Sequence, residues 1–181
     1  MRDHILETAA RLFYENGIRA VGVDRVIAEA NIAKATLFRH FATKELLVVA
    51  YLQARSERVQ ASLREVMANA GKSPQKRIVA LFHALEESAR TQPFRGCAFM
   101  LAVAELEESQ AIKSVARTHK DAVKALILEA LEQPDAAGRR LAEQLALLYD
   151  GALASILVYR DPRAAKFAAS AALSLFPAPV H

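Results

Sequence analysis

The stretch Ala30-Asn-Ile-Ala-Lys-Ala-Thr-Leu-Phe-Arg-His-Phe41 decides the fold of the first part of this chain. Asn31 predicts a tight break, because asparagine tolerates the left-handed backbone that often ends a helix. A short helix is expected to follow, with Leu37 and Phe41 on its apolar side. No acidic residue occurs from the start of this stretch to Lys44. This combination of a tight turn, an apolar side and a basic side is typical of a helix-turn-helix that enters the DNA major groove.

Two more short helices are expected ahead of this stretch. The first begins near the N-terminus and ends at Gly17, for which we expect a left-handed cap. The second runs from about Val23 to Ala30, with Asp24 at the positive end of its dipole. Residues 1–47 carry seven Lys and Arg against six Asp and Glu, so a DNA interface here depends on where the charges lie.

The sequence beyond residue 47 predicts more helices, which gives an all-α fold of about nine helices. Thr43 and Ser73 are good N-cap residues, and the breaks at residues 71–74, 91–93, 133–135 and 160–162 separate the segments. The expected helices are Lys44–Ala70, Pro74–Thr91, Cys97–Ala104, Gln110–Glu132, Ala136–Tyr159 and Arg163–Phe176. We therefore predict a DNA-binding domain over residues 1–47 and a regulatory and dimerisation bundle over residues 48–181.

The last two predicted helices have apolar faces too broad for one neighbouring helix to cover. This breadth, together with many small residues, favours a homodimer interface built from the two helices of each subunit. The alternative is a central pair of core helices within one subunit. The predicted interface residues are Leu145, Leu148, Ala152, Ser155, Ile156, Tyr159, Ala164, Phe167, Ala168, Ala171 and Leu175.

The composition fits an intracellular helical protein. The 181 residues are 53% apolar, with a formal net charge of +4 at pH 7. Cys97 is the single cysteine, which excludes an intramolecular disulfide and favours a reducing compartment. The N-terminus does not read as a signal peptide, and no uninterrupted apolar segment has bilayer-spanning length. We expect a soluble, cytoplasmic protein without a membrane partner.

Two parts of the N-terminal sequence resemble the tetracycline-repressor (TetR) family of bacterial regulators. Ile5-Leu-Glu-Thr-Ala-Ala-Arg-Leu-Phe13 with Gly17 is similar to the family's first helix. Residues 26–41, followed by Lys44-Glu-Leu-Leu47, are similar to its helix-turn-helix. The resemblance implies a two-domain, all-α homodimer that binds a palindromic operator and is released by a small ligand.

The resemblance also implies which residues would contact DNA. Phe38 stands where the family usually has Tyr, and Gly22 and Ala33 replace hydroxyl residues that cap helices and contact phosphate. We therefore expect Arg25, Arg39 or the amides near Gly22 to compensate. The candidate DNA-binding residues are Gly22, Val23, Arg25, Lys34, Ala35, Thr36, Phe38, Arg39, His40 and Lys44.

An apolar effector pocket is expected among the helices of the C-terminal part, suited to a hydrophobic or aromatic ligand. Its candidate residues are Met67, Phe82, Leu85, Phe99, Met100, Leu101, Val123 and Tyr149. His83 and His119 are interpreted either as pocket residues or as surface or structural ones. Cys97 is interpreted either as a small buried hydrophobe or as a redox or electrophile sensor.

The sequence shows no catalytic constellation, no phosphate-binding loop and no cluster of metal ligands, so we expect no enzyme activity, cofactor or metal. The predicted function is a ligand-responsive transcriptional regulator, a repressor that binds double-stranded DNA as a homodimer. Two alternatives stay open: a DNA-binding dimer that needs no effector, and a small helical enzyme that uses the apolar cavity.

Overall fold

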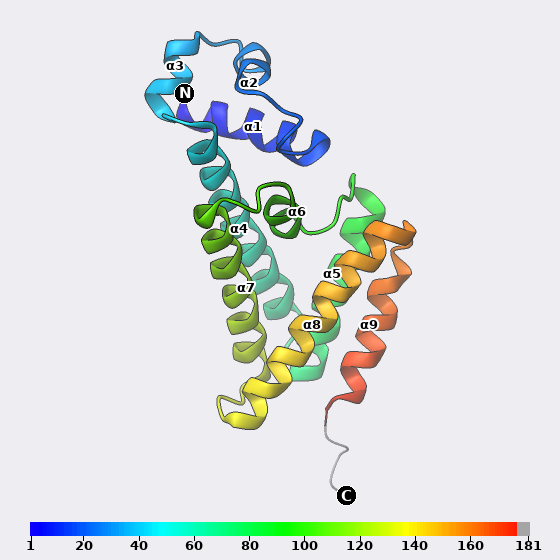
Figure 1. The fold of residues 1–181 in the computed structure, drawn as a ribbon. Helices are drawn as coiled ribbons and strands as arrows, with labels where there is room; N and C mark the ends of the chain where they lie inside the picture. Colours follow the sequence, from blue (N-terminus) through cyan, green and yellow to red (C-terminus); the bar gives the residue numbers. More distant parts are fainter. Residues whose placement is uncertain (177–181) are drawn as a thin grey trace, which may run out of the picture. The chain divides into compact units, whose positions relative to one another are not determined.

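The structure, a computed structural model, describes residues 1–176. Over these residues the chain forms nine α-helices and no strand, which confirms the predicted all-α class (Figure 1). The helices are α1 (Arg2–Asn16), α2 (Val23–Glu29), α3 (Lys34–His40), α4 (Lys44–Asn69), α5 (Pro74–Thr91), α6 (Ala98–Glu105), α7 (Gln110–Leu131), α8 (Ala136–Tyr159) and α9 (Arg163–Ser174). The end of the predicted 48–181 domain, residues 177–181, lies outside the described part.

The helix ends follow from local chemistry. Ser73 caps α5, since its Oγ accepts a hydrogen bond from the backbone N–H of Lys76 at 3.4 Å. Asp135 caps α8 in the same way and accepts from the N–H of Gly138 at 2.8 Å. Thr43 accepts from a backbone N–H in the first turn of α4, as its predicted N-cap role requires. These three helices therefore begin where a side-chain oxygen accepts a hydrogen bond from a first-turn N–H group that has no backbone acceptor.

The chain divides into two compact units. The headpiece unit contains Met1–Glu57 and Ala98–His119, and the bundle unit contains Arg58–Cys97 and the chain from Lys120 onward. Helices α4 and α7 thus contribute residues to both units. These units are not cut at residue 47, because Ala98–His119 groups with Met1–Glu57 although the two segments are distant in sequence. The predicted division at residue 47 stays a prediction about function.

The headpiece unit is closed around the apolar side of α1. Leu12 is fully buried, and the Phe13 ring lies 5.7 Å from that of Tyr51, between centroids. Gly17 ends α1, as expected, but its φ of 91° comes with a ψ of 152°. The cap is therefore not the left-handed helical one we predicted, although a positive φ still favours glycine there.

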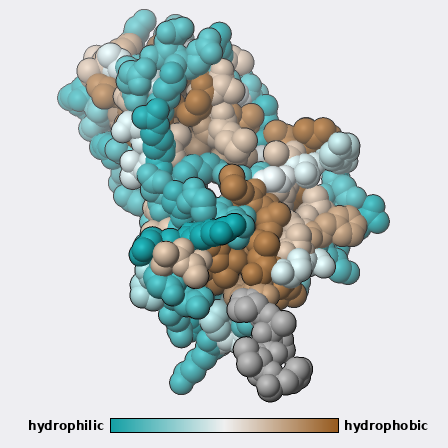
Figure 2. Space-filling model, turned by 60° about the horizontal axis from the view of Figure 1, so that its bottom comes forward, coloured by the Kyte–Doolittle hydropathy of each residue, from teal (hydrophilic) through white to brown (hydrophobic). Residues whose placement is uncertain are grey.

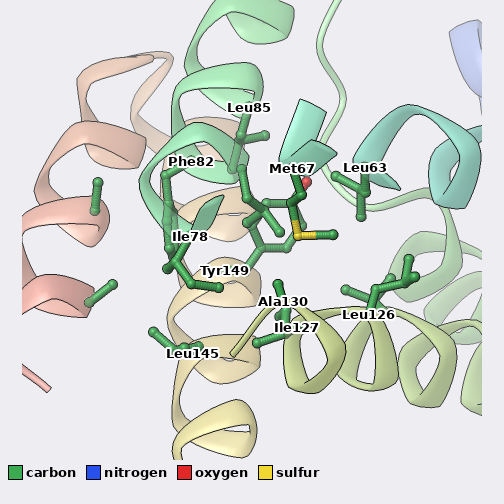
Figure 3. Packing of buried hydrophobic residues seen from close by; sticks show 14 of the residues in the cluster. Leu63, Met67, Ile78, Phe82, Leu85, Leu126, Ile127, Ala130, Leu145 and Tyr149 are labelled. Carbon is green, nitrogen blue, oxygen red and sulfur yellow. The ribbon is translucent and has the colours of Figure 1, made fainter. Parts of the chain in front are cut away.

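The bundle unit contains one large apolar core, in which α5, α8 and α9 pack against one another. Ile78 and Phe82 of α5 are fully buried, and Leu145 of α8 is 1% exposed. The rings of Phe82 and Tyr149 meet edge to face, with centroids 5.8 Å apart (Figure 3). One face of α8 is therefore buried in this core, and another face is exposed.

Helix α8 is long and apolar enough to cross a membrane, judged by length and composition alone. Glu143 and Asp150 interrupt its last 18 positions, so the expectation that no uninterrupted apolar segment has bilayer-spanning length is not contradicted. The apolar composition of α8 comes from two different faces of the helix. Leu145 packs in the core, whereas Leu147 and Val158 are 67% and 70% exposed. In the view of Figure 2, hydrophobic side chains, in brown, are exposed at the surface.

Candidate nucleic-acid interface

The turn between α2 and α3 is closed by backbone hydrogen bonds. The N–H groups of Asn31 and Ile32 donate to the carbonyl oxygens of Ala28 and Ile27, at 3.1 and 3.2 Å. Asn31 has a φ of 51°, the left-handed backbone that its side chain tolerates. The predicted tight break is therefore confirmed, and it fixes the direction in which α3 leaves the turn.

Helix α3 has one buried and one exposed side. Leu37 is fully buried and Phe41, just after the helix, is 3% exposed, as predicted. Phe38 is 37% exposed. Among the other DNA-binding candidates, Gly22, Arg25, Lys34, Ala35 and Arg39 are exposed, whereas Val23, Thr36 and His40 are partly buried. The exposed side thus gathers most of the candidates.

Lys34 faces an acidic partner across the turn. Its Nζ lies 3.5 Å from Oδ1 of Asp24, and the two side chains are 67% and 82% exposed. Such an exposed pair contributes little to stability and is screened by salt. The pair places the Asp24 carboxylate beside Lys34, which the family resemblance assigns to DNA. Asp24 and a DNA phosphate would therefore compete for the Lys34 ammonium group.

The two arginines expected to compensate for the missing hydroxyls differ in their surroundings. Arg25 lies 3.9 Å from Glu29, which also binds Arg11 at 2.8 Å. The hydrogen bond from Arg11 lowers the pKa of the Glu29 carboxyl. Arg39 forms no ion pair within residues 1–176. Of the two, Arg39 is the one with a guanidinium ready for a phosphate.

Neither α2 nor α3 has a side-chain cap. Gly22 and Ala33 occupy the two N-cap positions in extended backbone conformations, and neither helix shows a capping side-chain hydrogen bond. A Cβ added at Gly22 would meet no atom within 4 Å. The first N–H groups of both helices therefore lack a side-chain cap, which agrees with the loss of hydroxyls seen in the sequence.

Lys44 makes a contact within the chain that the sequence did not indicate. Its Nζ donates a 2.6 Å hydrogen bond to the carbonyl oxygen of Ile18, and partial burial lowers the pKa of its ammonium group. An ammonium group has three N–H donors, and this hydrogen bond uses one of them, so the expected phosphate role of Lys44 stays a prediction. The same hydrogen bond holds the connector between α1 and α2.

His40 is partly buried. Its Nε2 is enclosed and has no hydrogen-bond partner in the described chain. A phosphate could be reached only through the other ring nitrogen, because the enclosed one has no free surface. The predicted phosphate contact of His40 therefore depends on Nδ1 and stays a prediction.

Sequence reasoning missed two residues at the start of α1 that support the helix-turn-helix. The ring of His4 lies against the end of α2, with Nε2 at 2.9 Å from the carbonyl oxygen of Ala30. The guanidinium of Arg2 lies 5.1 Å from the centroid of the Phe41 ring. Neither pair has a local sequence signal, since their members are more than twenty residues apart.

Comparison with known proteins agrees with this geometry. The family model for bacterial regulatory proteins of the tetR family matches residues 5–51. The crystal structure of a TetR-family transcriptional regulator from Streptomyces coelicolor is 30% identical, with a TM-score of 0.81, over 96% of this chain and 93% of that one. The chain belongs to the TetR family. It is a DNA-binding transcriptional regulator.

Two curated relatives extend the comparison. The HTH-type transcriptional regulator YjdC of Escherichia coli is 24% identical over 170 residues, which cover 88% of this chain and 85% of YjdC. The HTH-type transcriptional repressor KstR2 of Mycobacterium tuberculosis is 33% identical over 87 residues, 48% of this chain and 43% of KstR2. The similarity to YjdC thus extends well beyond the TetR-family headpiece.

The predicted effector residues of this TetR-family chain do not form one cluster within either unit. The bundle core contains Met67, Phe82, Leu85, Val123 and Tyr149. The headpiece unit contains Phe99, Met100 and Leu101, of which Phe99 is 2% and Met100 45% exposed. Their role as ligand contacts stays a prediction.

The two histidines left open by the sequence also separate. His119 is 5% exposed, stacked on Phe99 with ring centroids 3.6 Å apart, and its Nδ1 lies 2.9 Å from Oγ of Ser56. This geometry is that of a structural histidine inside the headpiece unit. His83 is exposed on α5.

The predicted dimer residues divide into core and surface. Leu145, Ala152 and Ile156 are at most 3% exposed and belong to the bundle core, so they cannot form an interface with a second chain. This corrects our prediction for those three and agrees with the alternative of a core pair within one subunit. Among the other predicted residues, Leu148, Ser155, Ala164 and Ala168 are partly buried, and Tyr159, Phe167, Ala171 and Leu175 are exposed.

Proposed function

We propose that this TetR-family protein represses transcription by binding a palindromic operator as a homodimer, and that a small, mainly apolar effector releases it. The observation that carries the DNA-binding part is the exposed side of α3, which combines Lys34, Thr36 and Arg39 without an acidic residue of its own. The named repressor KstR2, similar over about half of the chain, supports the direction of regulation.

The proposed DNA contacts divide by chemistry. Lys34 offers a point charge to a phosphate or to guanine acceptors, and Thr36 offers a hydroxyl and a methyl group. Arg39 and Arg25 serve phosphates, with the exposed amides near Gly22 and Val23 and the Phe38 ring against the sugar. Ala35 is the small residue that lets the helix approach the bases. Lys44 and His40 are proposed to contact phosphate through the donor groups that their contacts within the chain leave available.

The proposed dimer uses the open faces of α8 and α9. Val158 and Tyr159 are 70% and 78% exposed, and Phe167 of α9 is 67% exposed. Large apolar side chains gathered on neighbouring helices favour a protein interface. A second copy could cover them with the same surface, since a two-fold axis pairs identical patches. Leu147, which is not among the predicted interface residues, is also exposed and joins this face.

An effector would act through its differential affinity for two arrangements of the dimer. Two recognition helices read half-sites about 34–36 Å apart when these are one helical turn apart. A ligand that binds better to a differently spaced arrangement therefore lowers operator affinity. We infer a cytoplasmic location, because a bacterial regulator must meet DNA there.

The proposal is tested by gel shifts on the DNA upstream of its own and neighbouring genes, at several salt concentrations. We expect a specific complex whose affinity falls with salt, because phosphate contacts release counter-ions. Binding no tighter than to an unrelated duplex would contradict the proposal. A specific complex that no small molecule from the neighbouring pathways releases would favour the effector-independent dimer instead.

A further inference from the structure

The bundle core contains one conspicuous polar atom, the hydroxyl oxygen of Tyr149 on α8. The neighbouring core residues Met67, Phe82 and Leu85 offer carbon and a thioether sulfur (Figure 3). The side chains classed as buried and polar in residues 1–176 are Thr8, Ser56 and His119, and all three belong to the headpiece unit. Among the described residues of the bundle unit, Tyr149 is therefore the buried residue that carries a side-chain hydroxyl.

The Tyr149 hydroxyl has no hydrogen-bond partner in the described chain, and the ring contact with Phe82 is edge to face. A buried hydroxyl without a partner is costly, so natural cores rarely keep one without a reason. Among fully enclosed polar side-chain atoms of residues 1–176, His40 Nε2 is the one that lacks a partner. The Tyr149 hydroxyl therefore retains accessible surface, in line with the 9% exposure of the residue.

The surroundings keep this phenol in its neutral form. Burial, with smaller effects of Cys97 and Asp150, raises the pKa of Tyr149 well above its ordinary value. Asp150 is held in an ion pair with Lys120. At neutral pH the hydroxyl thus carries its proton and can donate a hydrogen bond to an oxygen acceptor.

We propose that the Tyr149 hydroxyl is the polar anchor of the effector site, and that the effector is an uncharged, mainly apolar molecule with an oxygen acceptor such as a ketone. The core residues around the ring are apolar, and the nearby Asp150 carboxylate is already paired with Lys120. A charged ligand would therefore lose its hydration there without gaining a free counter-charge. A single directed donor among apolar side chains is the usual plan of a small-molecule site. This inference rests on the proposed effector response and adds the chemical class.

The test compares two probes of nearly equal shape, acetophenone and cumene, which differ by a carbonyl oxygen in place of a methyl group. Binding to the full chain is measured by calorimetry, for the wild type and for Tyr149→Phe. We expect the substitution to weaken acetophenone binding by roughly three- to tenfold, the range for one hydrogen bond between neutral groups. Cumene affinity should be unchanged.

Tyr159→Phe on the same helix is the matched control, because Tyr159 is 78% exposed and outside the core. It should leave both affinities unchanged. Failure of the wild type to bind acetophenone, or equal weakening of both probes in Tyr149→Phe, would overturn the anchor. Gel shifts with the same variant separate this outcome from a failure of the proposed function, since loss of the hydroxyl should leave operator binding without ligand intact.

Discussion

The Oε2 atom of Glu105, at the end of α6, accepts a 2.7 Å hydrogen bond from the backbone N–H of Arg19. The Nε of Arg19 donates in return to the carbonyl oxygen of Glu105. Lys44, at the start of α4, holds the adjacent Ile18 carbonyl. The connector between α1 and α2 is therefore fixed from two sides by helices that are distant in sequence.

Replacing Glu105 by Ala should loosen this connector. Loss of the carboxylate removes one hydrogen bond to a backbone N–H, which lowers the free energy of unfolding by about 1 kcal/mol. Urea unfolding measures this change, and hydrogen exchange should show faster exchange of the Arg19 amide. Glu107→Ala is the control, since Glu107 is exposed. Equal effects of the two substitutions would show that the contact with Arg19 adds nothing.

Replacing Asp24 by Asn should strengthen DNA binding. The change removes a negative charge beside Lys34 and frees its ammonium group, so operator affinity should rise several-fold and the dependence on salt should become steeper. Fluorescence anisotropy at four salt concentrations measures both quantities. Glu87→Gln, in the bundle unit, changes the net charge equally and should have almost no effect. An unchanged affinity in Asp24→Asn would mean that Lys34 does not contact DNA.

Replacing Ala33 by Ser should restore a helix cap. Ala33 already has the extended backbone of an N-cap residue, with φ −73° and ψ 147°, and lacks only the side-chain acceptor. A serine hydroxyl can accept from an N–H in the first turn of α3, which raises the free energy of unfolding by about 1 kcal/mol. Ala35→Ser, inside the helix, is the matched control and should not stabilise. Thermal unfolding of both variants decides whether the missing cap is the cause.

Replacing Phe167 by Asp should separate the proposed dimer. The side chain is 67% exposed, so the change costs little within one chain but places a charge in the centre of an apolar interface. Light scattering coupled to gel filtration should give a dimer for the wild type and a monomer for the variant. Lys166→Asp, one residue away and also exposed, should stay dimeric. A wild-type monomer at all concentrations would contradict the interface itself.

The helices and the turn could be predicted because their signals are local. Asparagine tolerates the left-handed backbone conformation, so Asn31 by itself indicates the turn. The buried positions of Leu37 and Phe41 follow from helical spacing. The same holds for Ser73, whose capping role depends on the next three residues. These features need no knowledge of what lies elsewhere in the chain.

The surroundings of the candidate site could not be predicted, because they depend on residues distant in sequence. Lys44 matches the family pattern, but the Ile18 carbonyl that binds it is 26 positions away. Nothing near Lys34 in the sequence shows that Asp24 faces it across the turn. On α8 the sequence indicated an apolar face too broad for one neighbour, but not which leucines pack in the core. Leu145 is buried there, whereas Leu147 is exposed.

The open apolar faces of α8 and α9 have a consequence for the amount of protein a cell must make. Where chains pair only weakly, the population of pairs grows with the square of the chain concentration. Promoter occupancy would then respond to expression level as a threshold, and a modest drop in supply would switch the regulated genes as effectively as a ligand. If Val158 and Phe167 form the proposed dimer interface, they link gene dosage to the control of transcription.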